Sequence, residues 1–126
     1  MPEKMNSRYV PSLPEPIAAF VAATNSHDLD ALLATFVDDA LVNDQFQEYW
    51  GKQAICIWAT REIIGASLHM AVVDSSEHYG HVIVRANIDG TFDKRGLPDP
   101  LLLDFYFSAR DDKIVQLIIL RNQSGT

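Results

Sequence analysis

The pattern of apolar residues changes after Gly65, and this change limits the folds open to the chain more than any other feature. Before Gly65 the apolar residues recur at intervals of three and four, which is the period of an amphipathic helix. After it, apolar and polar residues alternate, as in a strand with one buried face. Helices followed by strands predict an α+β domain with an antiparallel sheet, and not a repeated strand-helix-strand unit.

Three helices are expected in the first half of the chain. The first begins near Pro14, and Asp28 can cap a second that forms a helical hairpin with it. A third helix runs from Gly51 to near Gly65. A short strand over residues 40–42 lies between the second and third helices.

The second half predicts strands over residues 67–74, 78–92, 101–109 and 113–120. Residues 93–100 contain two prolines and a glycine and form a loop. A strongly twisted sheet curled around a long helix buries the apolar faces of both.

Composition excludes several classes of protein. The 126 residues carry a net charge of −7, which disfavours nucleic acid because phosphate contacts need a basic surface. The single Cys56 excludes an intrachain disulfide, and no apolar run reaches the length of a membrane span. These features predict a cytoplasmic protein that binds neither nucleic acid nor membranes.

The expected organisation is one domain with two tails. Residues 1–13 are polar with scattered prolines and read as a flexible amino-terminal tail. The domain covers residues 14–121, and residues 122–126 form a short carboxyl-terminal tail.

Asp104 is an unusual acid because it interrupts an apolar strand. Alternation places it on one face with Leu102 and Tyr106. A carboxylate in such surroundings is costly unless it is paired, protonated or open to a cavity, so Asp104 is a candidate functional acid. An equally good interpretation is a solvent-facing position, or an ion pair with Arg85 on a neighbouring strand.

Asp44 follows the short strand, at a point where the chain leaves the sheet and can border a pocket. Taken alone, it is more simply a turn residue. Tyr49 and Trp58 are expected in the core or in a pocket wall, and His69 is expected to be a surface or hydrogen-bonded histidine.

The histidines do not share a spacing typical of metal ligands. His78 and His81 are three residues apart, which places them on opposite faces of a continuous strand. We therefore expect no metal site.

Three segments together resemble the nuclear transport factor 2-like superfamily, whose cone-shaped α+β fold includes ketosteroid isomerase and the SnoaL-like polyketide cyclases. They are IAAFVAATNSHDLDALLATFVDDALVND over residues 17–44, WGKQAI over 50–55 and DFYFSARDDKI over 104–114. The resemblance implies a curled sheet wrapped around a long first helix, with three helices in all. No single segment is specific for an activity, because the same scaffold hosts enzymes and binding proteins.

The resemblance to ketosteroid isomerase implies a site with two aspartates facing one cavity. Asp44 matches the general base, and Asp104 matches the protonated acid that binds the enolate oxygen, an arrangement known from that isomerase. The tyrosine of that site is matched by Phe20, which has no hydroxyl. Tyr106 is expected to assist Asp104.

The sequence thus predicts a small-molecule protein of the isomerase or cyclase type that acts on an apolar carbonyl compound. Phe20, Tyr49, Trp58 and His69 would shape its pocket. No cofactor is needed, because side chains carry the protons. A homodimer formed through the sheet is also expected from the resemblance.

Two alternatives remain open from the sequence. One is a non-catalytic ligand-binding or dimerisation module, which the loss of a hydroxyl at Phe20 favours. The other is a cofactor-free dehydratase or epoxide hydrolase, in which His69 or His81 lies within hydrogen-bond reach of Asp44 or Asp104.

Overall fold

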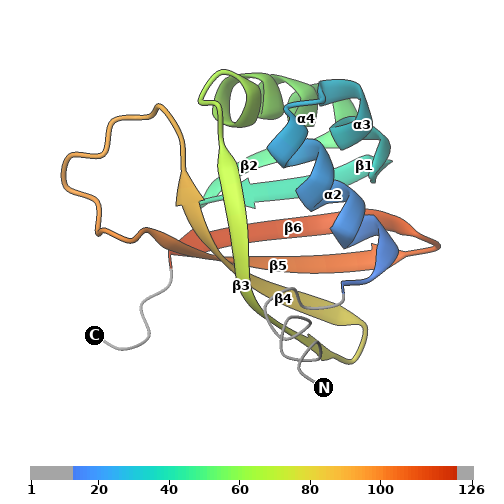
Figure 1. The fold of residues 1–126 in the computed structure, drawn as a ribbon. Helices are drawn as coiled ribbons and strands as arrows, with labels where there is room; N and C mark the ends of the chain where they lie inside the picture. Colours follow the sequence, from blue (N-terminus) through green and yellow to red (C-terminus); the bar gives the residue numbers. More distant parts are fainter. Residues whose placement is uncertain (1–12, 122–126) are drawn as a thin grey trace.

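The computed structural model describes residues 13–121 as three α-helices and a six-stranded sheet (Figure 1). Both expected tails lie outside this range, except for Leu13. The helices are α2 (Glu15–Ser26), α3 (Leu29–Ala34) and α4 (Gly51–Ala59), and a π-helical turn, η1 (Thr60–Ile64), continues α4. All three helices lie over the same face of the curled sheet, which confirms the expected α+β class.

The strands are β1 (Phe36–Asp44), β2 (Gln47–Trp50), β3 (His69–His78), β4 (His81–Asp89), β5 (Leu102–Arg110) and β6 (Lys113–Arg121). Their order across the sheet is β2-β1-β6-β5-β4-β3. All neighbours are antiparallel except β1 and β6, which run parallel. The carboxyl ends of β1 and β6 therefore meet at one end of the sheet, beneath α4 and η1.

The continuous strand expected over residues 78–92 is wrong at its start. Tyr79 and Gly80 form a two-residue turn between β3 and β4, with φ angles of 53° and 83°. Two left-handed residues match the twist of the flanking strands, so this turn closes a tight hairpin. His78 and His81 pair directly across it, so they lie on the same face of the sheet, contrary to the expectation from spacing.

The region around β1 also differs from expectation. The strand begins at Phe36 rather than residue 40, and β2, which the sequence did not predict, returns antiparallel to it. Gln45 and Phe46 make the turn with positive φ angles of 53° and 75°. The Asn43 side chain accepts a hydrogen bond from the Phe46 N–H, a local bond that stabilises such a turn.

The first helix supplies the centre of the core. Phe20 is fully buried and packs its ring against those of Phe36, Phe105 and Phe107, at centroid distances of 6.0, 6.5 and 5.2 Å. These aromatic contacts fix α2 against the inner face of β5 and against the start of β1.

Asn25 fastens the end of α2 to the first residues of β3. Its side-chain amide donates to the Met70 carbonyl at 2.9 Å and accepts from the Met70 N–H at 2.8 Å. The paired bonds satisfy a backbone position of the edge strand β3 that has no strand neighbour on that side. Nearby, the His27 ring lies 2.8 Å from the Leu68 carbonyl.

Candidate functional site

The inner face of the sheet opens into a pocket of about 430 Å³ at the end where β1 and β6 stop. Most of its wall is apolar, and the apolar residues that line it are Trp58, Ile63, Leu68, Ile88, Phe92, Leu97, Leu101, Leu103, Phe105 and Ile119. Four polar residues line it as well: Asp44, Gln45, Glu62 and Arg121. A concave apolar site with a few convergent polar groups is typical of small-molecule binding.

Alternation along β1 turns Asp44 into this pocket. Ala40, Val42 and Asp44 are each two residues apart on β1, so their side chains point to the same face of the sheet. Ala40 and Val42 are fully buried on the inner face. Asp44 comes next on that face and is partly buried, at the point where the core gives way to the pocket. Asp44 is therefore one of the polar residues at the edge of the pocket.

Two neighbours hold the Asp44 carboxylate in place. The indole N–H of the buried Trp58 donates to Oδ2 of Asp44 at 3.0 Å, and the Gln45 side chain also hydrogen-bonds to it. Burial raises the pKa of Asp44 above the ordinary 3.8, while the bonds from Trp58 and Gln45 lower it and the Glu62 carboxylate raises it. A carboxylate that is costly to ionise but firmly oriented suits general base catalysis.

Helix α4 and its π-helical extension bring two more side chains to the pocket. Trp58 lies on α4, and the widened turn of η1 carries Glu62 and the buried Ile63. The N–H of Gly65 donates to the Thr60 carbonyl five residues earlier, as in a π-helix. The sequence did not indicate Glu62, because a π-helical turn shifts the phase of the helical pattern.

Asp104 does not share the pocket with Asp44, so the expected pair of facing aspartates is wrong. Phe105 and Leu103 point from β5 into the pocket, and Asp104 between them points to the outer face. There it pairs across the strands with Arg85, with Nε and Oδ1 3.3 Å apart. The alternative interpretation from the sequence, an ion pair with Arg85, is confirmed.

Three of the residues expected to shape the pocket lie elsewhere. Phe20 is sealed in the core, and Tyr106 shares the outer face of β5 with Asp104. Tyr49 packs its ring 6.4 Å from that of Trp58, and its hydroxyl accepts a hydrogen bond from Arg61. Trp58 is the one of the expected wall residues that lines the pocket with Asp44.

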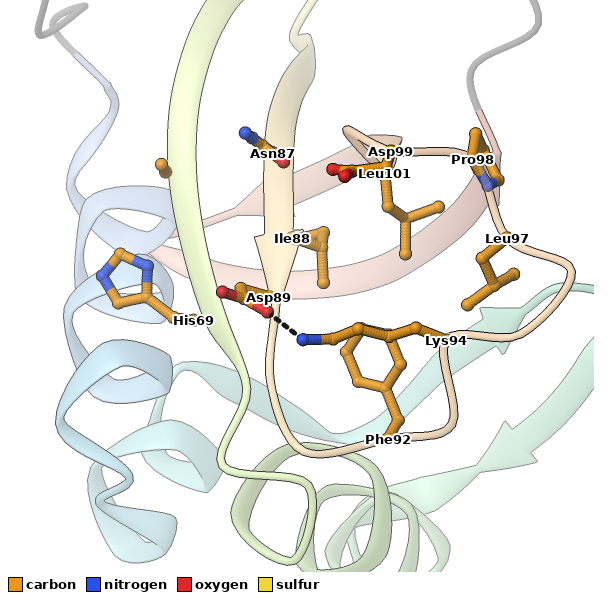
Figure 2. Close-up of a pocket in the computed structure, with 11 residues that line it drawn as sticks. His69, Asn87, Ile88, Asp89, Phe92, Lys94, Leu97, Pro98, Asp99 and Leu101 are labelled. Carbon is orange, nitrogen blue, oxygen red and sulfur yellow. Dashed lines mark hydrogen bonds and ion pairs between the residues drawn. The ribbon is translucent and has the colours of Figure 1, made fainter.

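His69 lines a second pocket of about 690 Å³, which residues of the loop over 90–101 also line (Figure 2). Lys94 of this loop forms an ion pair with Asp89 at the end of β4, with Nζ and Oδ1 2.7 Å apart, and Figure 2 shows the two side chains pointing toward one another. Phe92, Leu97 and Leu101 of the loop line both pockets, so the loop forms a shared wall. This pocket is more polar than the one that holds Asp44.

The structure does not place a histidine beside Asp44. Asp44 hydrogen-bonds to Trp58 and Gln45. The ring of His81 lies 2.8 Å from the Ser108 hydroxyl, and His69 lines the second pocket. Residues 13–121 contain no cluster of three or more side chains suited to holding a metal ion. No helix among them is long and apolar enough to cross a membrane.

Residues 17–117 match the family model of the SnoaL-like domain. The chain belongs to the SnoaL-like family. The match covers α3, α4, η1, β1 to β5 and parts of α2 and β6, and it includes Asp44 and Trp58 of the pocket but not Ile119 or Arg121. No curated protein shows significant sequence similarity to this SnoaL-like chain.

Solved structures agree with the family. A candidate polyketide cyclase from Sinorhizobium meliloti is 30% identical, with a TM-score of 0.77 over 86% of this chain and 95% of that one. A protein of ketosteroid isomerase-like fold from Catenulispora acidiphila, in complex with trimethylamine, is 21% identical, with a TM-score of 0.73 over 90% and 89%. A cystatin-fold protein from Novosphingobium aromaticivorans is 20% identical, with a TM-score of 0.68 over 85% and 96%.

Proposed function

We propose that this SnoaL-like protein is a cofactor-free enzyme that moves a proton on an apolar carbonyl compound, with Asp44 as the general base. One observation carries the proposal: a partly desolvated, firmly hydrogen-bonded carboxylate stands at the polar end of a mostly apolar pocket. The likeness to a candidate polyketide cyclase supports the same class of chemistry. The ligand is an apolar small molecule, because ten of the fourteen lining residues named above carry apolar or indole side chains.

The reaction begins when Asp44 takes a proton from a carbon next to the carbonyl. The electron pair of the broken C–H bond moves toward the carbonyl, and an enolate forms. In an isomerisation, Asp44 returns the proton to a different carbon. In a cyclisation, the enolate carbon attacks a second carbonyl, and the new alkoxide takes the proton from Asp44.

Hydrogen exchange tests this proposal without knowledge of the natural substrate. The probe is 2-tetralone in deuterated buffer, with loss of the proton signal next to the carbonyl followed by NMR. Wild-type protein is expected to accelerate exchange, and Asp44→Asn is expected to slow it by about 10²- to 10⁴-fold, the usual contribution of a positioned base. The rate should rise with pH through a pKa above 3.8, because burial raises the pKa of Asp44.

Asp39→Asn is the matched control, because Asp39 is an exposed aspartate on the same strand. It should leave exchange unchanged. Equal loss in both variants, or no acceleration by the wild-type protein, contradicts the proposal.

A dimerisation role has its own supporting observation. Ile83, Tyr106 and Ile118 pair across three neighbouring strands on the outer face, and each is only partly buried. We propose that this row forms part of a homodimer contact through the sheet, since single chains rarely leave apolar rows uncovered. Light scattering should find a dimer, and Tyr106→Glu should yield monomers, whereas Tyr79→Glu at the exposed hairpin tip should not. A monomeric wild-type protein contradicts it.

A further inference from the structure

An enolate formed in this pocket needs a group that stabilises its oxygen, and the residues first expected to do so are not available. Asp104 lies on the outer face with Arg85. Phe20 carries no hydroxyl and is buried beneath three phenylalanine rings. The stabilising group must therefore come from the residues that line the pocket.

Three of the side chains that line the pocket can donate a hydrogen bond whatever the pH. The Trp58 indole N–H is already bound to Asp44. The Gln45 amide donates to the Ile119 carbonyl at 3.2 Å, and its side chain also bonds to Asp44. Arg121 is the third, and no carboxylate of residues 13–121 lies within ion-pair distance of it.

The strand register places Arg121 beside Asp44 without pairing the two. Asp44 lies opposite Ile119 in the parallel pairing of β1 with β6. Arg121 follows two residues later on the same inward face, opposite Leu103 of β5. The base and the cation therefore approach the pocket from adjacent strands, one step apart along the sheet.

We propose that Arg121 binds the anionic oxygen of the ligand, so that the pocket takes carbonyl compounds whose enolate or phenolate oxygen points toward the end of β6. This inference deepens the proposed function and rests on it for the chemical step. When Asp44 has taken the proton, its own charge is gone and the negative charge lies on the ligand oxygen. Arg121 is exposed at the rim of the pocket, and a hydrogen bond from its guanidinium to the anionic oxygen is charge-assisted, so it is stronger than a bond between neutral groups.

Binding of a matched pair of ligands tests the role of Arg121. The probes are 4-nitrophenol, measured above its pKa where it is an anion, and 4-nitroanisole, its uncharged methyl ether, which is larger by one methyl group. Both are titrated against Asp44→Asn, because the neutral amide mimics the base after it has taken the proton. The absorption band of nitrophenolate reports its ionised state directly.

Adding Arg121→Met to Asp44→Asn should weaken nitrophenolate binding about tenfold, because a hydrogen bond to a charged group is lost. It should leave nitroanisole binding unchanged and raise the pKa of bound nitrophenol. Arg121→Lys should restore part of the affinity, since it keeps the charge but not the planar fork. Arg110→Met, at the exposed end of β5, is the matched control and should change neither ligand.

The results separate this inference from the proposed function. If Arg121→Met weakens both ligands equally, or neither, or if nitrophenolate does not bind, the inference is wrong, even where tetralone exchange still depends on Asp44. If nitrophenolate binding depends on Arg121 but the wild-type protein does not exchange tetralone protons, the role of Arg121 in anion binding is supported and the proposed reaction is wrong.

Discussion

Asp44 and Asp104 lie on the same sheet but on opposite faces, and their surroundings have little in common. Asp44 faces a pocket, receives the indole N–H of Trp58, and has a raised pKa because it is partly desolvated. Asp104 faces outward and lies 3.3 Å from the half-exposed Arg85. A strand alternates its side chains, so a shift of one residue decides whether a carboxylate meets the core or its partner cation.

The difference teaches which acid is suited to chemistry. Asp104 is paired with Arg85 and faces away from the pocket, so its carboxylate is not placed to reach a ligand there. The carboxylate of Asp44 is partly desolvated and forms no ion pair with a described residue, which makes it a stronger base, and its hydrogen bonds hold it in position. The inner face therefore carries the candidate site, and the outer face carries the ion pair of Asp104 with Arg85.

Substitution of the two aspartates gives the largest expected contrast. In the tetralone exchange assay, Asp44→Asn should lose about 10²- to 10⁴-fold in rate. Asp104→Asn should keep the rate of the wild-type protein, because its side chain does not reach the pocket. A loss of similar size in Asp104→Asn breaks the distinction between the two faces.

Filling the pocket from β5 gives a smaller contrast between the faces. Leu103→Trp adds volume where Leu103 lines the pocket, and it should weaken 4-nitroanisole binding about tenfold. Leu102→Trp adds the same volume one residue away, on the outer face, and should leave binding unchanged. Calorimetric titration measures both, and thermal unfolding checks that each variant is folded. Equal weakening by the two variants means that the bound ligand does not lie against Leu103.

The smallest expected effects are on stability. The raised pKa of Asp44 means that the folded state holds this proton more tightly than the unfolded state. The stability that the protein gains from this tighter proton binding is fully present below the pKa of Asp44 in the unfolded chain, about 3.9. It is lost as pH rises through the pKa of Asp44 in the folded state. Asp44→Asn should therefore gain stability relative to the wild-type protein between about pH 4 and neutrality.

Asp104→Asn should instead lower the free energy of unfolding by less than about 1 kcal/mol at neutral pH, because Arg85 is partly exposed and solvent screens the ion pair. Urea unfolding across the pH range measures both variants. A stability of Asp44→Asn that falls relative to the wild-type protein as pH rises contradicts the direction of the Asp44 pKa shift.

The order and class of the elements were predictable because they depend on local periodicity. The change from helical to alternating patterns near Gly65 coincides with the end of η1 and the approach to β3. The turns were less predictable, since Tyr79-Gly80 and Gln45-Phe46 place a large residue at positive φ, where glycine or asparagine is the usual signal.

The direction of Asp104 was not predictable, although its grouping with Tyr106 was correct. Both faces of β5 carry large apolar residues, so the sequence alone does not say which face meets the helices. The deciding facts are its register with Arg85 and the packing of Phe20 on Phe105, and both depend on segments distant in the chain. Arg121 had a usable signal, because it continues the inward alternation of Leu117 and Ile119.

The parallel pairing of β1 with β6 has a consequence for the order in which this protein is built. Gln45 and Ile119 touch although they are 74 residues apart in the chain. Contacts between such distant segments close large loops and form slowly, whereas the β3-β4 and β5-β6 hairpins need only short ones. A nascent chain thus carries its helices and Asp44 long before it has β6. The pocket that holds Asp44 is complete only when that strand is inserted, because Ile119 and Arg121 of β6 form part of its wall.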